Sequence, residues 1–363
     1  MSRRSTKLLK AALSALHYTG ADGLIAPFTS GKGVIFMLHH VTPEAAPDGG
    51  FSPNGILKVT PAFLESVIVQ VKAAGFECIS LDDIPKRLAD TSETRPFAVF
   101  TLDDGYKDNR DHAYPIFKRH GVPFTIYVPS AFADGSGDLW WLKLEEALRE
   151  LPRVRLDMNG TGRSFELSTD EERTAAFHEI YWWLRRIPED QARGVVNRIA
   201  RDAGLDGAKV CQDLVMSWDE LRALAADPLV TIGAHTTHHY ALAKLSDDKV
   251  RSEIADNVAR ITAEIGRPCR HLSYPYGCEL SAGEREFQIA CDLGMQTAVT
   301  TRKGLLHGYH ADLTTALPRL SLNGDFQNPR YVKVLLSGAP FAFWNALQRW
   351  TQPAQTGGQT APG

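Results

Sequence analysis

The chain lacks the features that mark fibrous, secreted and membrane-spanning proteins. Its five cysteines are widely spaced and form no Cys-x-x-Cys pair, which argues against a disulfide framework and against a cysteine-rich zinc site. No run of 18 apolar residues occurs, which argues against a transmembrane helix. The 363 residues are 44% hydrophobic and 23% charged, and they show no repeat of fixed period. We therefore expect a folded, water-soluble protein in a reducing compartment, the cytoplasm.

An excess of charge of one sign is also missing. The sequence has 40 Lys and Arg against 43 Asp and Glu, for a net charge of −3. Proteins that bind nucleic acids carry a clustered basic surface. We therefore predict no nucleic-acid partner, and the composition makes no prediction of the oligomeric state.

Residues 1–32 predict an N-terminal amphipathic helix. Lys10 interrupts the apolar stretch that a signal peptide would need. Packing onto the main domain is the expected role of this helix. Because Arg3, Arg4 and Lys7 also give it a basic face, peripheral contact with the inner membrane is the alternative.

Between residues 33 and about 330, β-rich runs alternate with helical patterns, which favours a largely parallel sheet covered by helices. Strands are predicted over 33–41, 76–80, 96–105, 122–129, 229–235, 269–277 and 295–301. Helices are predicted over 61–75 and about 246–265, and a third begins at Ser217, with Glu220 completing a capping box.

Three segments fall outside this alternation. Residues from about 138 to 212 are rich in Arg and Glu and have a helical period, so they predict a helical insertion. We expect its tryptophan pairs to pack onto the main domain, with stacking on sugar rings as the alternative. Residues 331–350 predict a C-terminal helix, and residues 351–363 a disordered tail.

Polar, metal-competent residues follow three of the predicted strands. They are Asp103 and Asp104, then His235 with His238 and His239, and finally the turn 274–277. In sheets of this kind, active sites are built where the carboxyl ends of parallel strands meet. The three groups are therefore predicted to converge.

Asp103 and Asp104 can share one pocket only if the strand breaks there, which Gly105 permits. One carboxylate could then bind a cation while the other works as a base. An Asp-Gly turn with two solvated acids is the alternative.

The histidine cluster can supply two further ligands. If the strand runs into a helical turn, His235 and His239 lie on one face, and His238 offers an alternative spacing. Surface or core histidines are the other interpretation. One aspartate and two histidines leave a fourth coordination position open, as catalytic metal sites do. The joint pattern favours a metallohydrolase.

Three motifs, in this order and at this spacing, resemble those of a known family. They are T-L-D-D-G at 101–105, H-T-T-H-H at 235–239 and S-Y-P-Y-G at 273–277. The segments F-M-L-H-H-V at 36–41 and M-S-W-D-E-L at 216–221 add to the likeness. The chain resembles the polysaccharide deacetylases with a NodB homology domain, carbohydrate esterase family 4, over about 33–137 and 212–330.

This resemblance implies an α/β fold, a distorted (β/α) barrel of about seven parallel strands that carries the helical insertion. It also implies one divalent metal ion, usually zinc (Zn2+), held by Asp104, His235 and His239. Asp103 would be the general base, and the backbone N–H of Tyr276 would donate to the oxyanion.

The implied activity is metal-dependent removal of N-acetyl groups from N-acetylhexosamine units of an oligosaccharide, polysaccharide or lipid-linked glycan, as in chitooligosaccharide deacetylases. An O-deacetylase, or esterase, of an acetylated polysaccharide is one alternative. A carbohydrate-binding pseudoenzyme of a biosynthetic complex is another, although a degenerate member would be expected to have lost part of the Asp and His set.

Four further residues are weaker candidates. His39 is predicted to orient substrate at the floor of the pocket, with a core histidine as the alternative. Arg319 resembles an arginine of exopolysaccharide-type members, where it would hold the base ionised; a surface arginine is the alternative. The family's late Leu-x-His motif, which supplies a general acid, has a formal match ending at His307. Because that match falls in a predicted loop, neither His307 nor His310 is assigned the role.

Overall fold

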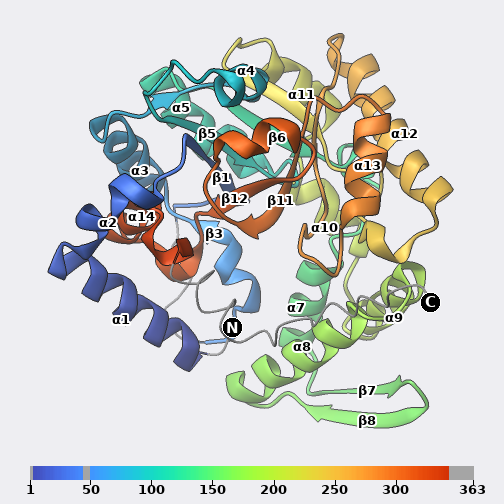
Figure 1. Cartoon of the computed structure of the whole chain (residues 1–363). Coiled ribbons are helices and arrows are strands. Elements are labelled where there is room, and N and C mark those ends of the chain that lie inside the picture. The colour runs from blue at the N-terminus through green and yellow to red at the C-terminus, as the bar shows by residue number, and fades with distance from the viewer. Residues whose placement is uncertain (1–2, 44–49, 343–363) are drawn as a thin grey trace, which may run out of the picture. The chain divides into compact units, whose positions relative to one another are not determined.

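The structure is a computed structural model that describes residues 3–43 and 50–342 (Figure 1). The chain divides into two compact units. One spans residues 32–329, and the other combines residues 1–31 with residues 330–363. The larger unit contains every residue of the predicted site.

Within the described residues, seven parallel strands close into a barrel, which confirms the predicted fold. In spatial order they are β1 (Gly33–Leu38), β12 (Leu317–Ser321), β11 (Thr297–Lys303), β10 (His271–Ser273), β9 (Val230–Ala234), β6 (Phe124–Val128) and β5 (Phe97–Leu102). Pairing of β5 with β1 closes the ring, and the short β4 (Glu77–Cys78) pairs with the start of β5.

The barrel strands are mostly apolar in sequence because both of their faces are covered. Every residue of β1, β5 and β6 is buried. The rings of Phe36 and Phe100 stack between β1 and β5, with centroids 5.0 Å apart. The strands are therefore mostly apolar, and few polar residues, such as Thr101 and Thr125, lie inside them.

Helices cover the outside of the barrel (Figure 1). They are α3 (Pro61–Ala73), α4 (Ile84–Ala89), α5 (Tyr114–His120), α6 (Ser130–Ala133), α11 (Trp218–Ala225), α12 (Asp247–Ile265) and α13 (Glu284–Asp292). At the start of α11, the Ser217 hydroxyl accepts the Glu220 N–H, and the Glu220 carboxylate accepts the Ser217 N–H. The predicted capping box is thus confirmed.

Shorter elements fill the connections. The pair β2 (His40–Val41) and β3 (Lys58–Val59) forms a small separate sheet. Single turns of 3-10 or π helix lie at Pro53–Leu57, Leu81–Asp83, Asn109–Ala113, Leu242–Lys244, Gly308–Asp312 and Gly324–Phe326.

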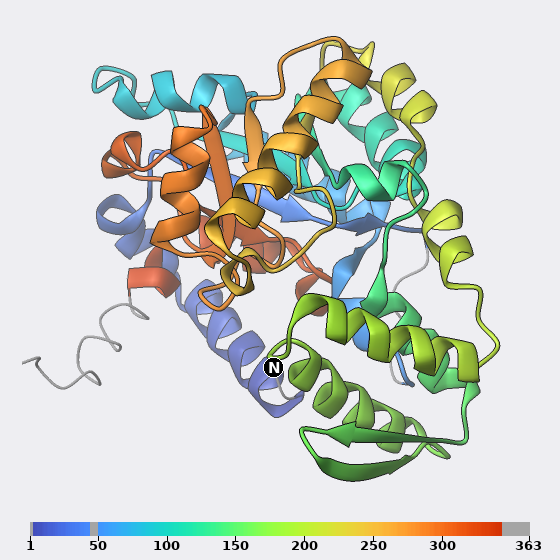
Figure 2. The same ribbon diagram turned by 90° about the vertical axis from the view of Figure 1, so that its right-hand side faces the viewer.

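The insertion is helical only in part. It contains helices α7 (Trp140–Glu150), α8 (Asp170–Leu184), α9 (Glu189–Asp202) and α10 (Gly207–Leu214). An antiparallel hairpin, β7 (Arg153–Met158) and β8 (Thr161–Glu166), lies at the outer edge of these helices (Figures 1 and 2). The predicted helical insertion is therefore present, and the hairpin within it was not predicted. The hairpin turns at Asn159 and Gly160, whose φ angles are 58° and 81°, and an Asn-Gly pair favours such a turn. This signal was present in the sequence, between two strongly helical patterns.

The buried tryptophans of the insertion pack partly against barrel residues and partly inside the insertion. Trp140, Trp141 and Trp183 are buried in a cluster that also holds Phe177. Trp140 and Trp141 contact Tyr276 and His239 of the main domain, so the expected packing onto that domain is confirmed for this pair. Trp183 instead donates to Asn159 of the hairpin. Trp182 is different, because 48% of it is exposed.

The smaller unit begins with two helices where one was predicted. Gly20, with a φ of 70°, separates α1 (Arg3–Thr19) from α2 (Ala21–Thr29). None of the described helices is both long and apolar enough to cross a membrane. Peripheral membrane contact stays a prediction. Of the helix predicted over 331–350, the structure gives α14 (Pro329–Leu336), and residues 343–363 lie outside the described residues.

Candidate active site

The end of β5 places two carboxylates side by side. The N–H of Asp103 still donates to the carbonyl of Leu38, at 2.9 Å, as a continuing strand would. Asp104 then has a φ of 74°, and Gly105 a φ of 72°. The predicted break therefore begins one residue before the glycine, at an aspartate, one of the few residues that tolerate this conformation. Both carboxylates are 2% exposed, so the alternative of a solvated Asp-Gly turn is wrong.

The guanidinium of Arg319 on β12 forms an ion pair with the Asp103 carboxylate. Its Nη1 and Nη2 donate to the two carboxylate oxygens at 2.8 and 2.7 Å, and its Nε donates to the carbonyl of Thr300 at 2.9 Å. Arg319 is 1% exposed, so the alternative of a surface arginine is wrong. Burial alone would raise the pKa of Asp103, but the charge and the hydrogen bonds of Arg319, with smaller contributions from His235 and His39, together hold that pKa below its usual value. Asp103 is therefore ionised at neutral pH.

Replacing Arg319 with Met should leave the Asp103 carboxylate buried without a counter-charge. We expect the free energy of unfolding at pH 7 to fall by about 3–5 kcal/mol, measured by urea denaturation. The folded-state pKa of Asp103 is lowered, so this contribution is present above the unfolded value of about 3.9 and is lost as the pH falls through the folded-state pKa. The difference between the two proteins should therefore shrink in acid.

The double variant Asp103→Asn with Arg319→Met is the control, because it removes the orphaned charge and should recover part of the lost stability. If Arg319→Met matched the wild type at pH 7, the ion pair would not be what holds the carboxylate.

His235 and His239 reach Asp104 from the loop after β9. Their Nε2 atoms lie 3.5 and 3.4 Å from Asp104 Oδ1. The strand does not continue into a helical turn, because residues 235–240 form a loop with positive φ at Thr236 and at His239. The N–H of His239 donates to the Thr236 hydroxyl at 3.0 Å, and this bond closes the loop. The two imidazoles converge through loop geometry rather than through helical spacing.

Both imidazoles can present a lone pair. The Nδ1 of His235 donates to the carbonyl of Ser273 at 2.6 Å, which leaves its Nε2 free to face Asp104. Burial lowers the pKa of His239 well below its usual value, so that ring is neutral. Neutral imidazole is the form that binds metal ions.

These residues fit one divalent cation. Asp104 Oδ1 is buried and has no hydrogen-bond partner among the described residues, although two imidazole nitrogens lie close to it. The ligand atoms of Asp104, His235 and His239 all lie within 4.8 Å of one another. Three such ligands with a fourth position open are typical of catalytic zinc sites.

His238 does not join this group. Its Nδ1 donates to Glu253 Oε1 at 2.7 Å, and its N–H donates to the other carboxylate oxygen at 2.9 Å. The alternative ligand spacing is therefore wrong.

Tyr276 enters from the loop after β10. Its φ is 61°, and that of Gly277 is 53°. A Cβ on Gly277 would lie 2.6 Å from the Thr301 nitrogen, so the loop packs too closely on β11 for any other residue. The ring of Tyr276 is 4.8 Å from that of His239, centroid to centroid, and its N–H donates to none of the described residues. The loop thus brings the Tyr276 ring beside one candidate metal ligand, and the backbone N–H of this residue has no acceptor among the described residues.

The remaining histidines separate into two places. His39 follows β1, and its Nε2 lies 4.0 Å from Asp103 Oδ2 with 20% of the side chain exposed, within reach of a bound molecule. His307 and His310 lie elsewhere: their neighbour Leu306 pairs with Gly33, at the amino end of β1. The formal Leu-x-His match therefore lies at the opposite end of the barrel strand from Asp103.

Contacts of the insertion with this site were not predicted from the sequence. Nη2 of Arg193 on α9 donates to the carbonyls of His238 and His239, at 3.1 and 3.2 Å. The ring of Trp141 on α7 is 4.9 Å from that of His239. The tryptophan pair was a visible signal, whereas nothing in the sequence linked Arg193 to a loop more than 40 residues away.

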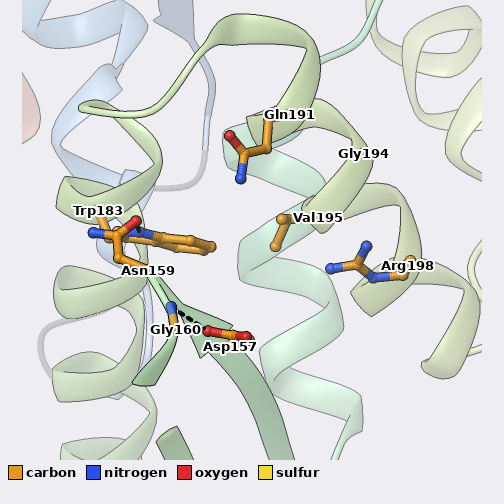
Figure 3. A pocket seen from close by; sticks show the side chains of 8 residues that line it. All are labelled: Asp157, Asn159, Gly160, Trp183, Gln191, Gly194, Val195 and Arg198. Atoms are coloured by element: carbon orange, nitrogen blue, oxygen red, sulfur yellow. Dashed lines mark hydrogen bonds between the residues drawn. The ribbon is translucent and has the colours of Figure 1, made fainter. Parts of the chain in front are cut away.

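A cavity of about 420 Å³ opens within the insertion, between the hairpin and helices α8 and α9 (Figure 3). Trp183 forms one wall, but the residue is only 6% exposed, and its Nε1 donates to Asn159. None of the candidate catalytic residues lines this cavity. The cavity is therefore separate from the cluster at Asp103 and Asp104.

The closed parallel (β/α) barrel carries a buried Asp and His cluster where its strands end, the position at which barrel enzymes place their active sites, and this cluster is a candidate metal site. The family model described as polysaccharide deacetylase matches residues 90–298, more than half of the chain. The chain belongs to the polysaccharide deacetylase family, whose members hydrolyse acetyl groups on glycans.

Solved structures share the fold. One is the Streptococcus pyogenes deacetylase PplD in complex with acetate, which is 15% identical, covers 84% of this chain and 96% of its own, and has a TM-score of 0.51. IcaB from Ammonifex degensii is 15% identical, covers 84% of this chain and 97% of its own, and has a TM-score of 0.51. A de-N-acetylase from Aggregatibacter actinomycetemcomitans is 15% identical, covers 83% of this chain and 99% of its own, and has the same TM-score of 0.51. At this identity the likeness concerns the fold alone. No curated protein sequence matches the chain.

Proposed function

We propose that this protein is a metal-dependent N-deacetylase of N-acetylhexosamine units in an oligosaccharide, polysaccharide or lipid-linked glycan. The observation that carries the proposal is the cluster of Asp104, His235 and His239 ligand atoms within 4.8 Å, beside a second carboxylate paired with Arg319. A structural metal site would need no ionised base next to it.

Asp104, His235 and His239 would hold the ion, and zinc suits a ligand set of two imidazoles and one carboxylate. When bound, the ion acts as a Lewis acid toward the acetyl carbonyl and lowers the pKa of water toward about 7. All other steps fall to side chains and backbone groups of the chain.

Asp103 would accept the proton of the attacking water, because it is ionised and adjoins the ligand cluster. Arg319 would act as a positioning residue that fixes the direction of this carboxylate. The N–H of Tyr276 would donate to the oxygen on which negative charge develops. His39 would contact the sugar at the floor of the pocket, since it is partly exposed and faces Asp103.

Two alternatives remain open to experiment. The same ligands and base can hydrolyse an acetyl ester, so an O-deacetylase uses an identical site. A carbohydrate-binding pseudoenzyme is the other alternative. The complete set of base, arginine and three ligands favours an enzyme over a pseudoenzyme.

The proposal predicts that purified protein contains about one zinc ion per chain and releases free amine from N-acetylated oligosaccharides. Metal content would be measured by atomic emission, and amine release by a fluorogenic reaction over a panel of N-acetyl sugars, with chitooligosaccharides included. Removal of the ion with a chelator should stop amine release, and added Zn2+ should restore it.

Acetylated xylan is the matched substrate for the alternative. Acetate release from xylan without amine release from any N-acetyl sugar would replace the proposal with an O-deacetylase. A metal-loaded protein inactive on both substrate types would favour the pseudoenzyme.

A further inference from the structure

The side chain of Tyr276 is held by the insertion. The Nε1 of Trp140, at the start of α7, donates to the Tyr276 hydroxyl at 2.7 Å. The guanidinium carbon of Arg185, directly after α8, lies 3.4 Å from the centroid of the Tyr276 ring. Two residues of the insertion therefore contact the Tyr276 side chain: Trp140 at its hydroxyl and Arg185 on one face of its ring.

Trp140 and Arg185 are themselves held in place by neighbouring residues. The ring of Trp140 stacks on that of Tyr181, with centroids 5.1 Å apart. Nη2 of Arg185 donates to the Ser281 hydroxyl at 2.6 Å, which holds the guanidinium over the ring. The contacts of Trp140 and Arg185 with Tyr276 are thus part of a packed surface.

The backbone of Tyr276 needs such support. A positive φ is unfavourable for a residue with a bulky side chain, and it persists only where the surroundings impose it. On the barrel side, the Thr301 hydroxyl donates to the Tyr276 carbonyl at 2.6 Å. On the insertion side, Trp140 and Arg185 hold the ring. Tyr276, the residue that carries the free N–H, is therefore held at its carbonyl and at its ring from two directions.

We propose that Trp140 and Arg185 are positioning residues, which hold the Tyr276 N–H where the oxyanion of the deacetylation reaction forms. This inference rests on the proposed function. A hydrogen-bond donor contributes to catalysis only when it is already aimed at the developing charge, and a displacement of about 1 Å can cost about 100-fold in rate. The insertion is then a working part of the active site.

Three variants test whether the contacts of Trp140 and Arg185 with Tyr276 support catalysis. Tyr276→Phe removes only the hydroxyl that Trp140 contacts, Trp140→Phe removes the donor, and Arg185→Met removes the charge while keeping an aliphatic side chain. We expect each to lower kcat by between about 10- and 100-fold. KM should stay within about twofold, because the ground state makes little use of the donor. Metal content should be unchanged.

The double variant Tyr276→Phe with Trp140→Phe is the most informative measurement. Both changes remove the same hydrogen bond, so the double variant should be no slower than the slower single variant. Trp182→Phe and Arg186→Met are matched controls in the same insertion, because both residues are exposed, and their kcat should equal that of the wild type. Thermal unfolding and circular dichroism would establish that each variant is folded.

Each outcome decides the inference. Folded Tyr276→Phe and Trp140→Phe variants with wild-type kcat would overturn it, as would a rise in KM alone. Independent, multiplicative losses in the double variant would also overturn it, and so would an equal loss in the Trp182→Phe control. A metal-loaded wild type without turnover on any acetylated glycan would overturn the proposed function and this inference with it. Turnover in the wild type with unaltered variants would overturn this inference only.

Discussion

An Asp104→Ala variant should purify without its metal ion and without measurable turnover. Asp104 is the one anionic group in the ligand cluster, and its Oδ1 has no other hydrogen-bond partner among the described residues. Two neutral imidazoles alone would bind a divalent cation far more weakly, by at least about 100-fold. Metal content after gel filtration, measured beside the rate of amine release, checks both expectations.

An exposed aspartate provides the control for this change. Asp256 on α12 is exposed and lies outside the ligand cluster, so Asp256→Ala should retain the ion and full activity. The wild type should also gain thermal stability when zinc is added, because the ion binds only the folded chain, and Asp104→Ala should not. Retention of a full equivalent of metal by Asp104→Ala would contradict its assignment as a ligand.

An Asp103→Asn variant should keep the metal ion and lose its catalytic base. The side chain of Asn has nearly the same shape but cannot accept the proton of the attacking water. We expect kcat to fall by about 100- to 10,000-fold, with metal content unchanged. Steady-state rates and metal analysis on the same preparation measure the two effects separately.

The contrast between the two aspartates matters more than either loss alone. They are adjacent in the chain and equally buried, so a general loosening of the loop would affect both in the same way. Equal loss of metal in the two variants would therefore contradict the division into base and ligand. Asp103→Asn also leaves Arg319 without its partner, so thermal unfolding is needed to show that the variant is still folded.

Much of the barrel was predictable from local patterns. Apolar runs marked six of the seven barrel strands, and Ser217 with Glu220 marked the start of a helix, because burial and capping depend on neighbours in the chain. The strand β12, which carries Arg319, was not predicted, and the predicted strand 76–80 lies outside the closed ring. The closure of the barrel was not predictable from local patterns. Pairing of β5 with β1 joins residues more than 60 positions apart, and no local pattern encodes it. The expectation of a closed barrel came from the three motifs.

The errors arose where neighbouring patterns competed. The hairpin over residues 153–166 has a clear Asn-Gly turn, but it lies between helices whose period dominates the insertion. The spacing of His235 and His239 suggested a helical turn, yet the loop reaches the same convergence with two positive φ angles. Spacing along the chain was a poor guide to side-chain direction in both segments.

The amino-acid sequence by itself determines the chemical types of the candidate ligands and their order along the chain. Which of those groups meet is decided only by the tertiary structure. His239 rather than His238 faces Asp104, Arg319 is buried beneath Asp103, and His307 lies at the far end of β1. Such placements depend on strand register, on loop φ angles and on packing between segments far apart in sequence. These are properties of the whole folded chain, so no short stretch of residues specifies them.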